Sequence, residues 1–426
     1  MNQRIQLSDH FTTSRILRFA ASPIIMMVFT SIYSVVDGFF VSNFAGKQAF
    51  AAVNLIMPFL QAFGCIGFML GTGGSAIVGI TLGEGDQKKA DRYFTLFLLA
   101  ALVSVSVLAV LGIVFLRPIA VLLGAKGELL DYAVRYGRIL MVSLPTFALQ
   151  NMFQSFFVTA EKPHLGFWFT VGAGCTNMVL DVLMVGIWGW GVEGAAIATF
   201  ISQLVGGVLP VFYFIDRSNS SRLHLCKTSF YSKVLRDACI NGSSELMTNL
   251  SMSLVNILYN YQLLRLAGEN GVAAYGVIMY AAFLFVAVFV GYAVGSAPIV
   301  SFHYGARNHA EVHNLYRKSL RLIAVVAVTL TLASMFIIPC VARIFVGYDA
   351  ELLALTSRAF RLYALSFLIM GFNVYASSFF TALGDGVTSA LISFLRTLAF
   401  QVIAILLLPL LLGICLLYTS PSPRDA

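Results

Sequence analysis

The sequence predicts an all-α polytopic membrane protein of two six-helix lobes, and three observations support this prediction. Of the 426 residues, 59% are hydrophobic and 11% are charged, whereas a soluble domain carries about 25% charged residues. The charged residues lie in short loops between long apolar runs, which is the pattern of a multi-pass membrane protein. The second half of the chain also repeats the first half in a nearly constant register.

Eleven apolar runs are long enough to cross a membrane, because a hydrocarbon core of about 30 Å needs about 20 helical residues. Runs of this length must be helical, since each backbone polar group in lipid needs a partner within its own segment. The predicted spans are 16–41, 51–82, 92–116, 130–158, 165–187, 192–215, 236–266, 272–302, 319–341, 352–382 and 388–414.

The first run is predicted to be a retained helix. The segment before it is polar and ends with Arg15 and Arg18, and no small-residue cleavage site follows the run. Pro23 lies inside this helix and Pro58 inside the next, so both helices should bend. We expect Pro23 to act as a hinge.

The distribution of Lys and Arg predicts a cytoplasmic N-terminus. Segments on the side of the N-terminus hold 16 of these residues and segments on the other side hold 9. Positive residues are enriched on the cytoplasmic side of membrane proteins. The net charge of +8 comes from these loops and therefore does not indicate a nucleic-acid partner.

An internal repeat divides the chain into two lobes. When the sequence is shifted by 222 residues, Asn151 falls on Asn373 and Ser155 falls on Ser377. A register held over more than a hundred residues indicates duplication. Six spans per unit keep both halves the same way up, and such parallel repeats enclose a cavity near the midplane. The predicted parts are an N-lobe (1–215), a cytoplasmic linker (216–235) and a C-lobe (236–414).

The last residues do not fit the repeat. Helix six at 192–215 predicts a twelfth helix near 414–437, but the chain continues from Cys415 with a short Ser/Pro-rich string and stops. This string resembles a translated sequencing adapter, so we expect residues 415–426 to be an artefact that replaces the native sequence after about Ile414.

Polar side chains inside the spans are the candidate functional residues, because an ionisable group in a bilayer is energetically expensive. Asp37 lies late in the first span. Asn177 and Asp181 lie one helical turn apart in the fifth, and Thr199 lies in the sixth. All four would lie at one depth and carry hard oxygen ligands, which suit Na⁺ or a shared proton. We expect them to form an ion-coupling site.

Three further polar groups lie in the second half. Glu245, early in the seventh span, is a possible acidic site of the C-lobe. Arg396 in the eleventh span is predicted to be a structural partner. His303 is expected beside the loop that follows the eighth span.

No enzyme motif is found. Gly83-Glu-Gly-Asp86 matches the GxGD pattern of intramembrane proteases, but it lies in a charged loop outside any span. The sequence contains no P-loop, HExxH or GxSxG motif. We therefore predict neither an enzyme nor a cofactor other than a coupling ion.

The chain resembles the multidrug and toxic compound extrusion (MATE) family. The resemblance covers nearly all of the chain up to Ile414 and rests on the two six-helix halves together with several motifs. These motifs are Ser22-Pro23, Val36-Asp37-Gly38-Phe39-Phe40-Val41, Ala51-Ala52-Val53-Asn54, Asn177-Met-Val-Leu-Asp181 and Gly191-Val-Glu-Gly-Ala-Ala-Ile-Ala-Thr199.

The resemblance implies export of organic, often cationic, amphipathic compounds in exchange for Na⁺ or H⁺. It also implies an ion site at Asp37, Asn177, Asp181 and Thr199. Some relatives use a Glu in helix 8, and 272–302 has no carboxylate. A bacterial inner membrane and a monomeric state are expected.

A lipid-linked oligosaccharide flippase of the same architecture is the alternative. It requires a cationic cleft for a pyrophosphate group, whereas the charges inside these spans are mainly acidic. A membrane enzyme is a third possibility, without a motif to support it.

Overall fold

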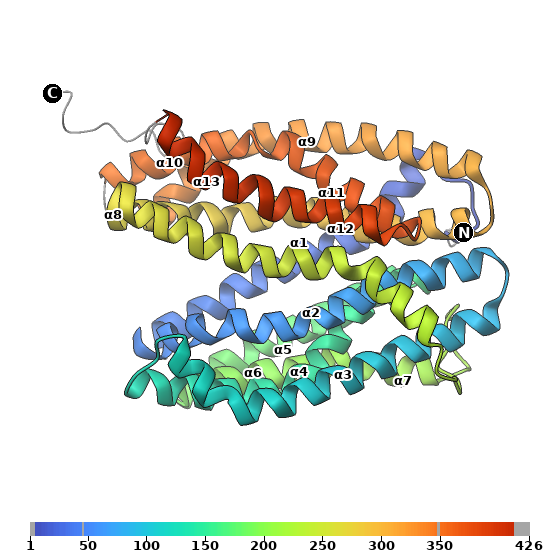
Figure 1. Cartoon of the computed structure of the whole chain (residues 1–426), viewed down its shortest axis with the longest axis horizontal. Helices are drawn as coiled ribbons and strands as arrows, with labels where there is room; N and C mark the ends of the chain where they lie inside the picture. The colour runs from blue at the N-terminus through green and yellow to red at the C-terminus, as the bar shows by residue number, and fades with distance from the viewer. Residues whose placement is uncertain (1–4, 45–46, 347–349, 413–426) are drawn as a thin grey trace.

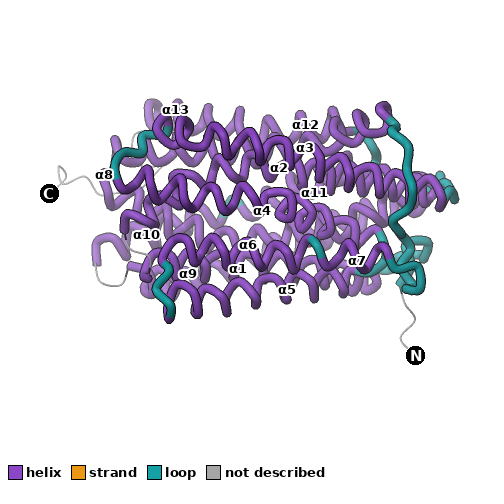
Figure 2. Tube along the Cα trace, turned by 90° about the horizontal axis from the view of Figure 1, so that it is seen from below, coloured by secondary structure: helices purple, strands orange, loops and turns teal. Residues whose placement is uncertain are grey.

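The structure, a computed structural model, describes residues 5–44, 47–346 and 350–412. All regular secondary structure in these residues is helical, and they contain no strand (Figures 1 and 2). The helices of the first half are α1 (Thr13–Phe44), α2 (Lys47–Gly83), α3 (Gln87–Leu122), α4 (Glu128–Thr159), α5 (Pro163–Leu180), η1 (Asp181–Ile187), α6 (Gly191–Gly207) and α7 (Leu209–Ile215). Those of the second half are α8 (Ser232–Gly305), α9 (His309–Val346), α10 (Ala350–Ala364), α11 (Phe367–Ala382), α12 (Gly386–Phe394), η2 (Leu395–Ala399) and α13 (Phe400–Leu412).

The predicted all-α membrane fold is confirmed, and the helices cover all eleven predicted runs as far as Leu412. Helix α8 contains two of these runs, 236–266 and 272–302, joined at Gly268 with φ +66°. By length and composition, 8 described helices can cross a membrane, or 9 if the bent pair α10 and α11 is one span. The predicted adapter-like tail, 415–426, lies outside the described residues.

The internal repeat is visible in the backbone as well as in the sequence. Asp86 caps the N-terminus of α3 by accepting from Lys89 N at 3.0 Å. In the equivalent place, Asn308 accepts from Glu311 N at the start of α9, at 3.1 Å. The residues before these caps, Gly85 and Arg307, both have positive φ. Turns and caps therefore recur together in the 222-residue register.

A second pair of turns repeats with a one-residue slip from this register. Glu161 and Gly384 both have positive φ and precede the residues that cap α5 and α12. At α12 the cap is Asp385, which accepts from Thr388 N at 3.1 Å and from Thr388 Oγ1 at 2.6 Å. These bonds, the hydroxyl first, hold the pKa of Asp385 below its ordinary value. The cap therefore stays ionised at neutral pH.

Helices α2 and α8 form the central seam between the two halves. Figure 1 shows them crossing near the end with the N-terminus and separating toward the other end. The crossing needs small residues, because a Cβ added at Gly242 would overlap the carbonyl oxygen of Met69. One added at Gly73 would overlap backbone atoms of Ala238 and Gly242. Close backbone approach through glycine is typical of packed membrane helices.

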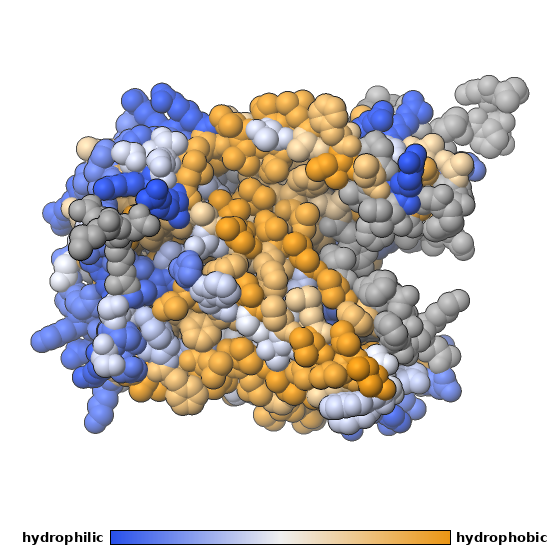
Figure 3. Space-filling view, turned by 180° about the vertical axis from the view of Figure 1, so that it is seen from behind, coloured by the Kyte–Doolittle hydropathy of each residue, from blue (hydrophilic) through white to orange (hydrophobic). Residues whose placement is uncertain are grey.

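Hydrophilic residues lie at both ends of the molecule and are more abundant at one of them. Figure 3 shows this end beside a broad apolar band. We call it the basic end, because it carries the turn with Lys88 and Lys89 and the non-helical segment 216–231. The segment joins α7 to α8, and the predicted lobe boundaries at 215 and 236 remain predictions.

The N-terminal segment 5–12 ties the two halves together at the basic end. Leu7 N donates to Glu161 Oε1 of the first half at 2.9 Å. Phe11 N donates to Glu311 Oε1 of the second half at 2.8 Å, and His10 Nδ1 lies 2.6 Å from Glu311 Oε2. Leu7 and Phe11 are fully buried. The segment therefore contacts both halves with side chains and backbone.

Candidate ion-coupling site

Three of the predicted polar residues, Asp37, Asn177 and Asp181, lie close together, and helices of the first half position them. Asp37 lies on α1 and Asn177 on α5. Asp181 is the first residue of η1, a π-helical turn that continues α5. Such π-turns are rare and occur frequently at functional sites. The widened turn holds Asp181 on the buried side, where its side chain has no exposed surface.

Helix α1 approaches α5 closely at a glycine near this site. A Cβ added at Gly174 would lie 2.6 Å from Phe29 Cε1 and 3.2 Å from Tyr33 Cδ1, both on α1. Gly174 lies three residues before Asn177, on the same side of α5. Because Gly174 has no side chain, α1 can approach α5 closely enough to bring the Asp37 carboxyl group to the polar face of α5.

The carboxyl groups of Asp37 and Asp181 lie together. The Asp37 side chain interacts with the side chains of Asp181 and Asn177. Both Asp181 oxygens are buried, as are Oδ1 of Asp37 and Oδ1 of Asn177, and none of them accepts a hydrogen bond from a described residue. Asn177 is 2% exposed. The cluster is therefore rich in buried acceptors and poor in donors.

This geometry has a direct chemical consequence. Two adjacent carboxyl groups in a low-dielectric interior cannot both remain charged without compensation. A hydrogen bond between them requires one of them to carry a proton. A cation with hard oxygen ligands would satisfy the same acceptors. The cluster can thus hold either a proton or a small cation such as Na⁺.

No hydrogen bond among the described residues joins Thr199 to this cluster. Thr199 lies on α6, which packs against α5 and η1. Its carbonyl oxygen accepts from the Ser202 hydroxyl at 2.8 Å. The predicted role of its own hydroxyl as a ligand remains a prediction.

The structure adds Tyr136 of α4 to the site. This side chain is 1% exposed and interacts electrostatically with both Asp37 and Asp181. Its hydroxyl lies 3.9 Å from the sulfur of Met57. A tyrosine hydroxyl in an apolar run needs a partner, and this requirement is the sequence signal that could have identified it.

The remaining predicted residues lie elsewhere. Pro23 is inside α1, as predicted, and its backbone packs against Gly291 of α8. Glu245 lies on α8 and interacts with Arg396 of η2. His303, near the end of α8, is 3% exposed because Phe11 of the N-terminal segment covers it.

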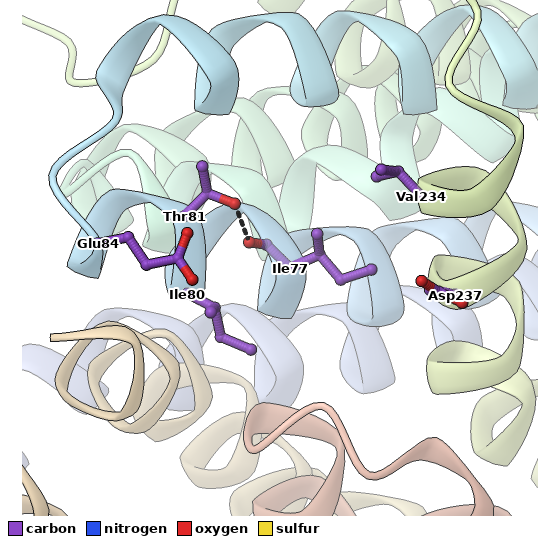
Figure 4. A pocket seen from close by; sticks show the side chains of 6 residues that line it. All are labelled: Ile77, Ile80, Thr81, Glu84, Val234 and Asp237. Carbon is purple, nitrogen blue, oxygen red and sulfur yellow. Dashed lines mark hydrogen bonds between the residues drawn. The ribbon is translucent and has the colours of Figure 1, made fainter. Parts of the chain in front are cut away.

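A surface hollow at the basic end is separate from these groups. Its lining comes from the last turns of α2, the turn that follows them and the first turns of α8 (Figure 4). Carboxylates of Glu84 and Asp237 lie at its two sides, and Thr81 bonds back to Ile77 O at 2.9 Å. The hollow marks the place where the seam between α2 and α8 reaches the surface.

Comparison with known proteins gives consistent matches over nearly the whole chain. The family model described as MatE matches residues 23–183 and again residues 246–407. The starts of the two matches agree within one residue with the 222-residue register of the repeat. The "Multidrug export protein MepA" of Staphylococcus saprophyticus is 20% identical over 385 residues, which are 89% of this chain and 84% of that protein.

Solved structures share the fold. The "Crystal structure of MATE in complex with MaD3S" superposes with a TM-score of 0.89 at 23% identity, covering 98% of this chain and 94% of the other. The structure described as "Outward-facing conformation of a multidrug resistance MATE family transporter of the MOP superfamily" gives 0.88 at 23% identity. It covers 94% of this chain and 89% of that chain.

Proposed function

This chain belongs to the MatE family, and we propose that it is a secondary antiporter that exports organic, mainly cationic, amphipathic compounds in exchange for Na⁺ or H⁺. The names of its relatives as multidrug export proteins support this proposal. The observation that carries it is the carboxyl pair of Asp37 and Asp181, in which Oδ1 of Asp37 and both oxygens of Asp181 are buried and have no hydrogen-bond donor among the described residues. A site of this kind gains or loses a cation as the surrounding protein changes shape.

The contacts of α1 suggest how ion binding is coupled to movement of the lobes. Helix α1 contacts α5 at the carboxyl pair and also packs along α8 of the other half. A Cβ added at Gly291 of α8 would lie 2.8 Å from Pro23 O and 2.5 Å from Ile24 Cα. The predicted hinge therefore lies at the contact with the other lobe. A bend there on ion binding would alter the packing of the two halves.

The transport cycle follows from the opposite preferences of the ion and the exported compound for the two states of the protein. The ion binds the outward-open state at Asp37 and Asp181, and the compound leaves from between the lobes. The lobes then rock, the ion leaves toward the cytoplasm and a new compound binds. Coupling requires only that the two ligands favour different states by about 1–3 kcal/mol. We place the protein in the plasma membrane as a monomer, with the N-terminus in the cytoplasm.

The experiment compares ethidium efflux from cells carrying the wild type, Asp37→Asn or Asp181→Asn, with Na⁺ and pH varied separately. Both substitutions should abolish the ion dependence and most of the efflux. Asp131→Asn, at an exposed carboxylate of α4, is the matched control and should behave as wild type. Unchanged efflux in both buried variants would reject the site. Absence of efflux from well-expressed wild type, with transport of a lipid-linked precursor, would favour a flippase.

A further inference from the structure

The lipid-facing side of α3 shows where the membrane ends at the basic end. Residues 93–116 carry no charged side chain, and this stretch is long enough to cross a hydrocarbon core, which needs about 20 helical residues. Val103 is 62% exposed, and Val107 and Val110, one and two turns further on the same side, are also exposed. This side of α3 therefore faces lipid. Exposed Arg92, just before the apolar stretch, lies at the membrane edge.

The segment 216–231, which joins α7 to α8, crosses this side of α3 at the membrane edge. Leu96 lies two turns before the first of the exposed valines and on the same side, but it is only 5% exposed. The joining segment bonds to the turn around it. Cys226 N donates to Thr95 Oγ1 at 3.1 Å, and the Thr228 hydroxyl donates to Arg92 O at 2.9 Å. The segment therefore lies between α3 and the lipid, at the depth of the headgroups.

The outer surface of the segment combines an aromatic ring with basic groups. Phe230 is 75% exposed, whereas the ring of Tyr231 packs against Tyr93 of α3 with a centroid distance of 5.4 Å. The Tyr231 contact holds this part of the segment on α3 and leaves the Phe230 ring uncovered beside the helix. Lys227 is exposed. Neither Lys227 nor Arg92 forms an ion pair within the described part of the chain.

The neighbouring carboxylates of α3 and its cap are already engaged. Asp91 accepts from His224 N at 3.0 Å and from Gln87 Nε2 at 3.2 Å. Asp86 pairs with Lys89 at 2.8 Å. The basic groups of the surface therefore keep charge that these carboxylates do not compensate. Uncompensated positive charge beside an exposed ring, at the membrane edge, matches an anionic headgroup above an acyl chain.

We propose that residues 226–230 and the first turns of α3 form a binding surface for an anionic phospholipid. Phe230 inserts between the acyl chains, and Lys227 and Arg92 bind the phosphate of the headgroup. Because the segment is bonded to α3, a lipid bound there attaches the first half of the molecule to the membrane surface. The inference goes beyond the proposed export function, since it concerns a lipid and holds whichever compound is exported.

A single tryptophan at position 230 tests the insertion. Phe230→Trp is introduced into a full chain whose three native tryptophans are replaced by Phe, and the purified protein is placed in nanodiscs of phosphatidylcholine brominated on its acyl chains. The bromines should quench its emission severalfold more than that of Glu84→Trp, which lies in the exposed turn before α3. Both positions are exposed, so neither substitution should disturb the fold. Equal quenching at the two positions would overturn the inference.

The same tryptophan reports which headgroup the surface prefers. Brominated phosphatidylglycerol should be preferred over brominated phosphatidylcholine by about tenfold, because each basic group near an anionic headgroup contributes a factor of about three to five. Lys227→Gln and Arg92→Gln should each lower the preference by about that factor. Lys126→Gln, the same change of charge in an exposed turn at the other end, should leave it intact. Equal quenching by the two lipids, or an equal loss in Lys126→Gln, would contradict the proposed surface.

Discussion

At the scale of single residues, the ability of the site to hold a proton or cation depends on the small number of hydrogen-bond donors around its carboxyl oxygens. Asp181 has no exposed surface and its two oxygens accept no hydrogen bond from the described residues. The hydroxyl group of Tyr136, on α4, lies near both carboxyl groups. A hydroxyl at this position can donate to one carboxylate or help to hold the coupling ion. We therefore expect it to adjust the ion affinity of the site without contributing a charge.

Replacing Tyr136 by Phe removes that hydroxyl and keeps the ring. We expect the apparent affinity for the coupling ion to fall about tenfold, since a hydrogen bond to a charged group contributes roughly 1.5–3 kcal/mol. The melting temperature should change little, because the described hydroxyl contact is a long one to the sulfur of Met57 at 3.9 Å. Efflux measured against ion concentration is the readout. Tyr132→Phe, one turn earlier on α4, is the control, and equal effects of both substitutions would argue against the role.

At the scale of elements, α2 and α8 are in contact through backbone at the basic end. Their approach depends on glycines that leave no room for a Cβ. The same helices expose Asn54, Pro58 and Leu254 toward the other end. The two helices therefore cross and pack closely at the basic end.

Gly242→Val tests this contact. Its side chain would overlap the Met69 carbonyl of α2, and such overpacking costs about 1–3 kcal/mol. We expect a lower melting temperature and a seam that opens at the basic end. Gly276→Ala on the same helix is the matched control, because a Cβ there meets nothing within 4 Å. A melting temperature for Gly242→Val equal to that of the control would show that the seam is not closed through this contact.

The N-terminal segment is the second element that joins the halves. Glu311 accepts from Phe11 N and Asn314 Nδ2 and lies beside His10. Glu311→Gln should weaken these bonds and speed amide hydrogen exchange in residues 5–12 severalfold. Hydrogen exchange with mass spectrometry measures the effect. Glu128→Gln, at an exposed carboxylate of α4, should leave the exchange unchanged. Equal protection in both variants would mean that packing of Phe11 alone holds the segment.

At the scale of the whole molecule, the apolar band and the basic end define an orientation. The band in Figure 3 is wide enough to cover the side of the molecule, and charged loops collect beside it. Positive residues favour the cytoplasmic side. The closed seam therefore faces the cytoplasm in our proposal, and the separated ends of α2 and α8 face outward.

Cysteine labelling tests this orientation in a cysteine-free background. Ser229→Cys lies in the exposed linker at the basic end, and Lys126→Cys lies in an exposed turn at the other end. A membrane-impermeant maleimide should label position 126 in intact cells and position 229 only after the cells are broken. The opposite pattern would invert the proposed topology.

The sequence by itself determined the properties that depend only on the order of residues along the chain. Hydropathy and run length predicted the helices, and the register predicted the duplicated halves that the two family matches confirm. The need to neutralise charge in lipid singled out Asp37, Asp181, Glu245 and Arg396. The predictions of the helices and of the repeat succeed because the cost of exposing backbone polar groups to lipid depends little on what packs beside them.

The tertiary structure alone decided which of these residues meet. The placement of Tyr136 beside the carboxyl pair, the contact of Arg396 with Thr248 and the burial of His303 under Phe11 depend on how each helix is rotated. The apolar pattern carries little information on rotation, because lipid and protein interior are equally apolar and give no strong hydrophobic preference for one helix face. Rotation is set by glycine contacts such as Gly174 with α1, which become visible only once the helices are packed.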